Sequence, residues 1–145
     1  MLFKNKDKES FEISEKSRFK NCGIMVDNSR NAVMNVERMK KLIAQSALLG
    51  YDSIQLYNED TFEVDNQPFF GYMRGRYSQE ELRECDDYAE IFGIEMMPCI
   101  QTLSHLAKML KWSQFADVMD TDLIMNVGEE KTYEVIKTMI KAATA

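Results

Sequence analysis

Three strand-like runs of this sequence each end in side chains that could do chemistry. An aspartate and an arginine follow the first run, two carboxylates follow the second, and the only histidine follows the third: Asp27 and Arg30, Glu59 and Asp60, and His105. A strand of a parallel sheet is buried on both faces, so polar residues gather at its end mainly to serve a site. In barrels and open α/β sheets that site lies at the carboxyl ends of the strands. The pattern therefore predicts that these five residues share one edge of a sheet.

Each group also has a simpler interpretation. The Arg30 guanidinium can donate paired hydrogen bonds to neighbouring hydroxyls or a carboxylate, but an ion pair with Asp27 that steadies the loop fits equally well. The Glu59 and Asp60 carboxylates suit acid–base chemistry or metal binding, and a solvated acidic loop is the alternative. His105, just past a strand end, is as consistent with catalysis as with a structural role.

The segment from 62 to 77 is long for a loop and rich in aromatic residues and arginines: Phe62, Phe69, Phe70, Tyr72, Arg74, Arg76 and Tyr77. Long loops are uncommon unless they are functional or disordered, and the aromatic content argues against disorder. These side chains could line a sugar site, or the rings could pin the loop to the rest of the fold. Trp112 could likewise stack on a sugar or pack beneath short helices.

Hydrophobic periodicity and capping signals predict the elements that position these residues. Strands are expected at about 19–27, 52–57 and 94–100, and short helical pieces at 103–111 and 114–119. Asn35 is a predicted N-cap, and Gly50 ends the helix that it begins. Ser78 and Glu81 form a capping box, and a last helix begins near Glu129. Strands that alternate with helices predict an α/β fold with a parallel sheet and right-handed crossovers.

Composition limits the classes of function. The 145 residues are enough for one domain with a hydrophobic core. The formal net charge is −6, and the scattered lysines and arginines argue against a nucleic-acid-binding groove. No apolar run approaches the roughly 18–20 residues of a membrane span, so we expect no membrane contact. The polar start of the chain lacks the order of a signal peptide, which predicts a cytoplasmic location but says little about a longer parent.

The three cysteines are odd in number and have no metal-binding spacing. Cys22, Cys85 and Cys99 are therefore predicted to be buried free thiols, without a disulfide or zinc. The sequence has no glycine-rich phosphate loop, no HExxH motif and no Ser-His-Asp spacing. We expect neither a metal nor a cofactor.

Four ordered stretches carry a family resemblance: GIMVDNSR at 23–30, LYNEDTFE at 56–63, FGYMRGRY at 70–77 and PCIQTLSH at 98–105. They resemble motifs of the β-N-acetylhexosaminidases of glycoside hydrolase family 20, most of all its streptococcal-type N-acetylglucosaminidase branch. The resemblance runs from about residue 19 to the end of the chain and implies about the first three βα units of a TIM (β/α)8 barrel. Residues 1–18 would then be the tail of a preceding small domain or a linker.

The resemblance also implies an activity. Members of the family remove terminal N-acetylglucosamine or N-acetylgalactosamine with retention, and the substrate's own acetamido oxygen is the nucleophile. A strand-4 Asp-Glu pair orients the acetamide and supplies the general acid. This chain has no counterpart of that pair, so we expect a carbohydrate-processing parent and an isolated chain that is inactive.

By the same resemblance, each candidate residue receives a role. Arg30 matches the arginine that holds sugar hydroxyls, and we expect Asp27 and Glu59 to be substrate-binding residues beside it. His105 matches the histidine behind the catalytic glutamate, and Asp60 matches the carboxylate that partners this histidine. Because Asn-Glu-Asp stands where the family usually has His-Leu-Thr-Asp-Asp, Glu59 is the alternative partner.

Two other functions fit the same residues. A different sugar-acting (β/α)8 enzyme, such as a metal-dependent isomerase or lyase, would take metal ligands from Glu59, Asp60 and His105. A flavodoxin-like domain without catalytic activity would bind a carbohydrate or another partner.

Three βα units would leave the inner face of a barrel uncovered, and five apolar residues are expected on that face: Ile24, Val26, Ile54, Leu56 and Ile100. Parallel sheets are rarely stable with one face uncovered, and open sheet edges recruit other chains. We therefore expect the isolated chain to self-associate.

Overall fold

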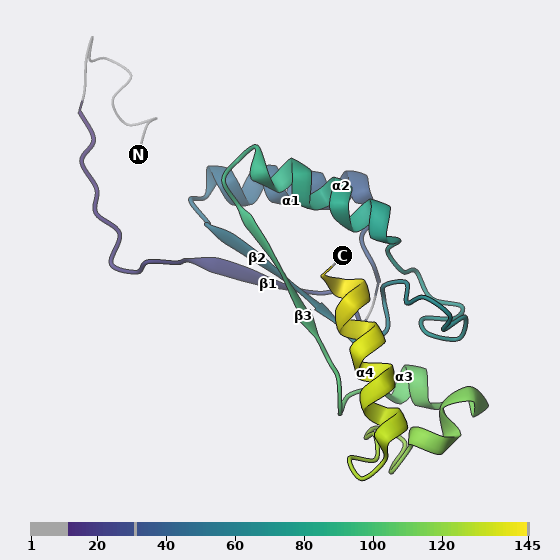
Figure 1. Cartoon of the computed structure of the whole chain (residues 1–145). Coiled ribbons are helices and arrows are strands. Elements are labelled where there is room, and N and C mark those ends of the chain that lie inside the picture. The colour runs from purple at the N-terminus through teal and green to yellow at the C-terminus, as the bar shows by residue number, and fades with distance from the viewer. Residues whose placement is uncertain (1–11, 31, 145) are drawn as a thin grey trace.

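The computed structural model describes residues 12–30 and 32–144, in which strands alternate with helices (Figure 1). The elements in chain order are β1 (Gly23–Asp27), α1 (Val36–Leu48), β2 (Ser53–Asn58), α2 (Gln79–Glu90), β3 (Glu95–Ile100), α3 (Ala107–Leu110), the 3-10 helix η2 (Ser113–Val118) and α4 (Glu130–Ala143). The predicted α/β alternation is confirmed, although β1 begins at Gly23 rather than near residue 19. Residues 1–11 of the expected N-terminal tail lie outside the described residues.

Local signals in the sequence set the ends of the two long helices beside the sheet. The Oδ1 atom of Asn35 accepts a hydrogen bond from the backbone N–H of Arg38 (3.0 Å) at the start of α1. Gly50 follows that helix with a φ of +80°, which glycine adopts at little cost. Ser78 and Glu81 exchange the two hydrogen bonds of a capping box at the start of α2. The predictions of these helix ends are confirmed.

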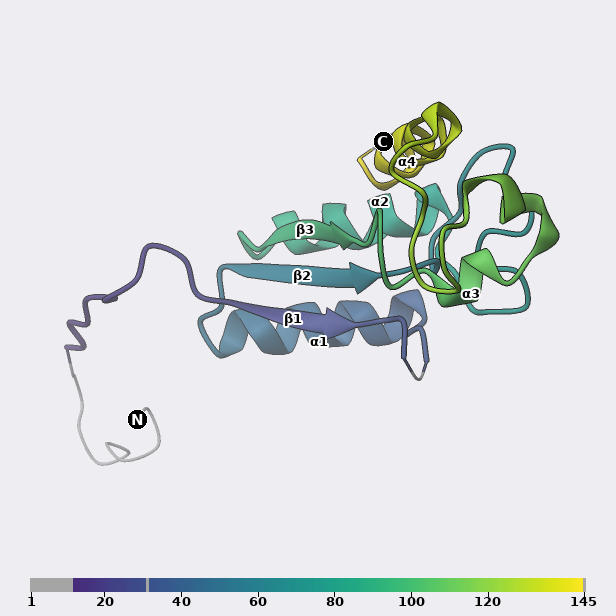
Figure 2. The same ribbon diagram turned by 90° about the horizontal axis from the view of Figure 1, so that it is seen from below.

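The sheet has three parallel strands in the order β1-β2-β3, so the carboxyl ends of all three strands lie at one edge. Two neighbouring rows across the sheet are Ile24, Ile54 and Met96, and then Met25, Gln55 and Met97. Successive rows point to opposite faces because strand side chains alternate. Helices α1, α2 and α4 lie on one side of the sheet, and no described helix covers the other side (Figures 1 and 2).

Two clusters of buried apolar side chains hold these elements together. The first lies between the sheet and helices α1 and α2, and its buried members are Met39, Ile43, Ile54, Leu56, Tyr77, Cys85, Ala89 and Ile94. The second joins the loop after β2 to α3, η2 and α4, and its buried members include Phe62, Phe70, Leu106, Met109, Phe115 and Met139. The long loop after β2 is therefore part of the core, as its aromatic content suggested.

The uncovered face of the sheet is the opposite of the one predicted. Four of the residues expected on it pack instead against α1 and α2, namely Ile24, Val26, Ile54 and Leu56. Ile100 packs against the second cluster. The uncovered face carries the alternate row, in which Met25 is 58% exposed. The alternation places Ile24, Val26, Ile54 and Leu56 on one face, but it does not say whether the helices or the interior of a barrel cover that face.

The cysteines correct a further expectation. Cys85 is buried and Cys99 is half-buried, but Cys22 is exposed just before β1. All three are free thiols. In the described part of the chain, no helix combines the length and apolar character needed to cross a bilayer.

Candidate functional site

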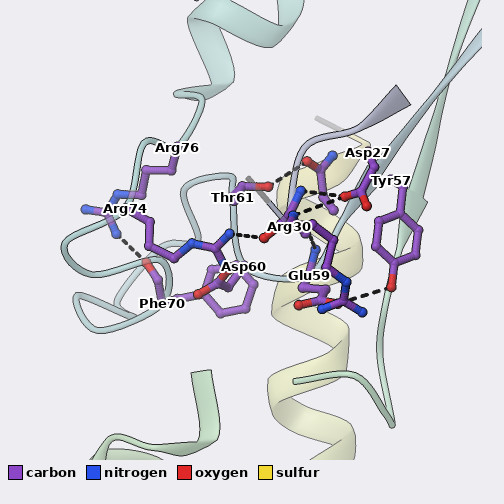
Figure 3. Close-up of polar contacts among 11 residues, drawn as sticks. Asp27, Arg30, Tyr57, Glu59, Asp60, Thr61, Phe70, Arg74 and Arg76 are labelled. Atoms are coloured by element: carbon purple, nitrogen blue, oxygen red, sulfur yellow. Dashed lines mark hydrogen bonds and ion pairs between the residues drawn. The ribbon is translucent and has the colours of Figure 1, made fainter. Parts of the chain in front are cut away.

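The candidate site lies where the loops after β1 and β2 meet, at the edge formed by the carboxyl ends of the strands (Figure 3). Asp27 is the last residue of β1, and Arg30 follows it in the next turn. Glu59 and Asp60 directly follow β2. His105 follows β3, in the turn before α3. The prediction that these residues follow the carboxyl ends of adjacent parallel strands is confirmed.

Arg30 and Glu59 form an ion pair that joins the two loops. The Nη1 atom of Arg30 lies 2.8 Å from the Oε1 atom of Glu59. The Glu59 side chain is 1% exposed, whereas the Arg30 side chain is 54% exposed. The hydroxyl of Tyr57 also donates to Glu59 Oε1 (3.2 Å). Glu59 thus holds the guanidinium of Arg30 through one of its nitrogens. The exposed part of the Arg30 side chain can still donate hydrogen bonds to a ligand.

Burial and the nearby Glu59 charge raise the pKa of the Tyr57 hydroxyl. A protonated Tyr57 is the form that can donate to the carboxylate. Tyr57 therefore stays a donor throughout the neutral pH range.

Asp27 closes the turn after β1 and does not pair with the arginine side chain. Its Oδ1 atom accepts hydrogen bonds from the backbone N–H groups of Ser29 (2.8 Å) and Arg30 (3.2 Å). The ion pair between Asp27 and Arg30 that the sequence allowed is replaced by the pair between Arg30 and Glu59. Asp27 thus acts on Arg30 through the backbone, by fixing the turn that carries it.

Asp60 is held by an arginine from the long loop after β2. The Oδ1 atom of Asp60 lies 2.5 Å from Nη1 of Arg74, and the Asp60 side chain is 1% exposed. Its other oxygen, Oδ2, is buried and has no hydrogen-bond partner among the described residues. Burial raises the pKa of the Asp60 carboxyl, and the positive charge of Arg74 opposes that rise. Asp60 therefore retains one free acceptor inside the site.

His105 does not contact either carboxylate. It is exposed and has a φ of +61°, in a turn that leads into α3. No hydrogen bond joins His105 to Asp60 or Glu59 within the described residues, so the expected pairing of Asp60 with His105 is not formed in this structure. The His105 side chain is exposed, whereas Asp60 is buried and pairs through its Oδ1 atom with Arg74, and Glu59 pairs with Arg30.

Two further residues complete the site: Ser29, which the sequence did not assign to it, and Arg74, which the sequence offered only as a possible lining of a sugar site. The hydroxyl oxygen of Ser29 accepts a hydrogen bond from the backbone N–H of Glu59 (2.7 Å). Arg74 donates a hydrogen bond to the carbonyl oxygen of Ser29. The signal for Arg74 was present, since two arginines lie shortly after two adjacent carboxylates. Which arginine meets which carboxylate depends on the path of the loop, which the sequence does not state.

Aromatic rings gather beside the site where the loop meets the segment after α3. Phe69, Tyr72 and Trp112 pack mutually with ring centroids 5.2–5.6 Å apart. Phe69 and Tyr72 stay 38% and 44% exposed. The rings thus pin the loop and still present apolar surface. Across residues 12–30 and 32–144, no group of three or more His, Cys, Asp or Glu side chains is arranged to hold a metal ion.

Solved structures with a similar fold include glycoside hydrolases of family 20. An exo-β-N-acetylglucosaminidase from Vibrio harveyi, solved with N-acetylglucosamine, has a TM-score of 0.76 and 21% identity over 86% of this chain and 25% of that chain. A β-N-acetylhexosaminidase from Bacteroides fragilis gives 0.74 and 24% over 86% and 29%. The chain shares the fold of part of these enzymes. This similarity confirms, at the level of fold, the resemblance seen in the sequence.

The similarity extends to the streptococcal-type branch. A catalytic module of the pneumococcal exo-β-D-N-acetylglucosaminidase StrH has a TM-score of 0.66 and 17% identity over 83% of this chain and 37% of that chain. No protein-family profile matches the sequence. The chain spans about a quarter to just over a third of the length of the three family 20 structures.

Proposed function

We propose that this chain forms about the first three βα units of a (β/α)8 barrel in an exo-acting β-N-acetylhexosaminidase. The observation that carries the proposal is the half-exposed side chain of Arg30, held at the carboxyl edge of the sheet by the buried carboxylate of Glu59. It occurs in a fold similar to family 20 hydrolases. By the sequence resemblance, Arg30 corresponds to the family's sugar-binding arginine. The substrate would be a glycan with a terminal N-acetylglucosamine or N-acetylgalactosamine.

In this proposal the reaction retains the configuration at the anomeric carbon. The acetamido oxygen of the substrate attacks that carbon, and a general acid protonates the leaving oxygen. Water then opens the cyclic intermediate. Arg30 donates hydrogen bonds to the sugar hydroxyls, and the turn closed by Asp27 keeps it in place. The general acid and the carboxylate that orients the acetamide are not supplied by these 145 residues.

His105 and Asp60 support the general acid in this scheme. The buried Oδ2 atom of Asp60 accepts no hydrogen bond from the described residues and is the acceptor that we assign to His105. A carboxylate that accepts from one imidazole nitrogen fixes the tautomer of the ring and directs the other nitrogen toward the acid. The assignment requires the turn at 101–106 to bring His105 over Asp60.

The test compares the 145-residue chain with the polypeptide that carries the complete barrel, using 4-nitrophenyl N-acetyl-β-D-glucosaminide and its galactosaminide counterpart. We expect hydrolysis only by the complete barrel. Arg30→Ala should raise KM by about 10-fold to 100-fold, since a charge-assisted hydrogen bond is lost. His105→Ala should lower kcat more than it raises KM, because it acts through the acid. Arg38→Ala, on the exposed face of α1, is the control.

Three results would contradict the proposal. Turnover by the 145-residue chain would show that the decisive chemistry lies within it. An unchanged KM in Arg30→Ala would remove this arginine from the sugar site. Activity that is lost on adding a chelator and regained with a divalent metal would favour the isomerase or lyase alternative.

A further inference from the structure

The loop at 62–77 is closed at its neck immediately after Asp60. The Glu63 N–H donates to the Tyr77 carbonyl (2.8 Å), and the Tyr77 N–H donates to the Thr61 carbonyl (3.0 Å). Phe62 and Phe70, at the neck and in the middle of the loop, pack edge to face in the second cluster. The loop is therefore a fixed part of the structure and can transmit its position to Asp60.

The loop touches Asp60 from two sides. Gly71 has a φ of +66°, and a Cβ atom at this position would overlap the carbonyl oxygen of Asp60. The loop backbone thus lies directly on the Asp60 backbone. Arg74, three residues further, reaches the Asp60 carboxylate at 2.5 Å. Among the described residues, Arg74 is the only hydrogen-bonding partner of this carboxylate.

Arg74 also connects Asp60 to the segment that carries Arg30. Its Nη2 atom donates to the Ser29 carbonyl oxygen while Nη1 binds Asp60 (Figure 3). Ser29 in turn accepts the Glu59 N–H, and Glu59 holds the guanidinium of Arg30. One planar guanidinium therefore joins the two loops that carry the candidate sugar-binding and acid-supporting residues.

The charge of Arg74 matters because Asp60 is almost fully buried. Burial raises the pKa of the Asp60 carboxyl and so favours the protonated form, and the Glu59 charge acts in the same direction. Arg74 and, to a lesser degree, Lys111 oppose this rise. Without Arg74, more of the Asp60 side chain would be neutral at a given pH.

We propose that Arg74 is a positioning residue that orients the Asp60 carboxylate, leaves its Oδ2 atom free, and couples it to the Arg30 segment. This inference rests on the proposed function, in which Asp60 supports the general acid. Arginine suits the role because its fork can bind a carboxylate and a carbonyl in one plane, whereas a lysine ammonium is a single point charge. Lysine at this position would keep the charge and lose the bridge.

The first measurement follows the Asp60 carboxyl carbon by NMR during a pH titration of the full chain. We compare wild type with Arg74→Gln and Arg74→Lys. Arg74→Gln should raise the pKa of Asp60 by at least about one unit, a tenfold change in proton affinity. Arg74→Lys should restore much of the wild-type value because it keeps the charge.

The matched control is Arg76→Gln, two residues further along the same loop. Arg76 is part-buried like Arg74, but it donates to the Phe70 carbonyl and lies 3.6 Å from Glu63, away from Asp60. Arg76→Gln should leave the pKa of Asp60 unchanged. Urea unfolding of all three variants separates a loss of folding from a loss of positioning, and Arg74→Lys keeps the test valid if Arg74→Gln does not fold.

The second measurement uses the complete barrel and the chromogenic substrate. Both Arg74 variants should lower kcat by about 10-fold to 100-fold with a smaller change in KM, since misplacing a supporting group by about 1 Å can cost this much. Arg76→Gln should retain the wild-type kcat. If Arg74→Lys restores the pKa of Asp60 but not kcat, the charge of Arg74 sets the pKa, and its bridge between Asp60 and Ser29 is needed for the rate.

Two results would overturn the inference: an Asp60 pKa in Arg74→Gln equal to that in Arg76→Gln, or a wild-type kcat in Arg74→Gln. Failure of the proposed function looks different. A wild-type barrel that hydrolyses no N-acetylhexosaminide would refute the function, while the titration would still decide whether Arg74 controls Asp60.

Discussion

Arg30 Nη1 and Glu59 Oε1 lie 2.8 Å apart, and the two side chains differ in exposure, since that of Glu59 is buried and that of Arg30 is half exposed. A buried charge depends on its partner more than an exposed charge does, because water cannot replace the partner. Removing the arginine therefore costs more than the pair itself contributes.

We predict that Arg30→Ala lowers the free energy of unfolding by about 1–3 kcal/mol, the cost of leaving a buried acceptor unsatisfied. Adding Glu59→Gln should recover part of this loss, because the uncompensated charge is then gone. Urea unfolding of the two single variants and the double variant measures the coupling. Strictly additive effects would mean that the pair is not formed in solution.

The buried carboxyl of Asp60 should make stability depend on pH in a defined direction. Burial raises its pKa above the usual 3.8, so the folded chain binds this proton more tightly than the unfolded chain does. The contribution of Asp60 to stability must then fall as the pH rises from about 4 through the raised pKa. Asp60→Asn removes this dependence.

We therefore predict that the free energy of unfolding of Asp60→Asn, minus that of wild type, increases over this pH range. Asp60→Asn also removes the charged partner of Arg74, which shifts this difference in free energy by the same amount at every pH. Urea unfolding at several pH values measures the trend, and Asp87→Asn on the exposed face of α2 is the control. A difference that decreases with pH would show that Arg74 outweighs burial.

The three thiols should differ in reactivity. Burial raises the pKa of Cys85 to about 11, whereas Cys22 is exposed. Because the thiolate is the reactive form, we predict that iodoacetamide at pH 8 modifies Cys22 first and Cys85 only after unfolding. Peptide mapping by mass spectrometry measures both sites. Equal rates at the two sites would contradict the packing of α2 against the sheet.

The uncovered face of the sheet should govern self-association of the isolated chain. Met25 lies on this face and is 58% exposed. We predict that Met25→Lys weakens association at least about tenfold, since a charge opposes burial of the face. Light scattering over a concentration series measures this. Leu48→Lys, at the exposed end of α1, should have little effect, and equal effects of the two variants would place the contact elsewhere.

Much of the fold could be predicted because its signals are local. Asn35 and Ser78 satisfy backbone N–H groups within three residues of themselves, so a short stretch of sequence is enough to identify them. The alternation of strands and helices then required parallel strands with their carboxyl ends together. The edge on which Arg30 and Asp60 lie followed directly from this topology.

The partners within the site could not be predicted, because they depend on the route of the loop. Arg74 reaches Asp60 only because Gly71 lets the loop backbone lie on the Asp60 carbonyl. Neither Arg74 nor Arg76 carries a local signal that assigns it to Asp60 instead of Glu63. The prediction of which sheet face stays uncovered was wrong for a similar reason. Met25 and Ile24 are both apolar, and only tertiary packing decides which of them contacts the helices.

The cluster between the sheet and helices α1 and α2 draws its buried members from a stretch that ends at Ile94. The second cluster needs α4, which begins only at Glu130. A chain emerging from the ribosome can thus complete the first cluster while the residues of α4 are still being added. Contacts that close in the order of synthesis shorten the time during which apolar side chains stay exposed.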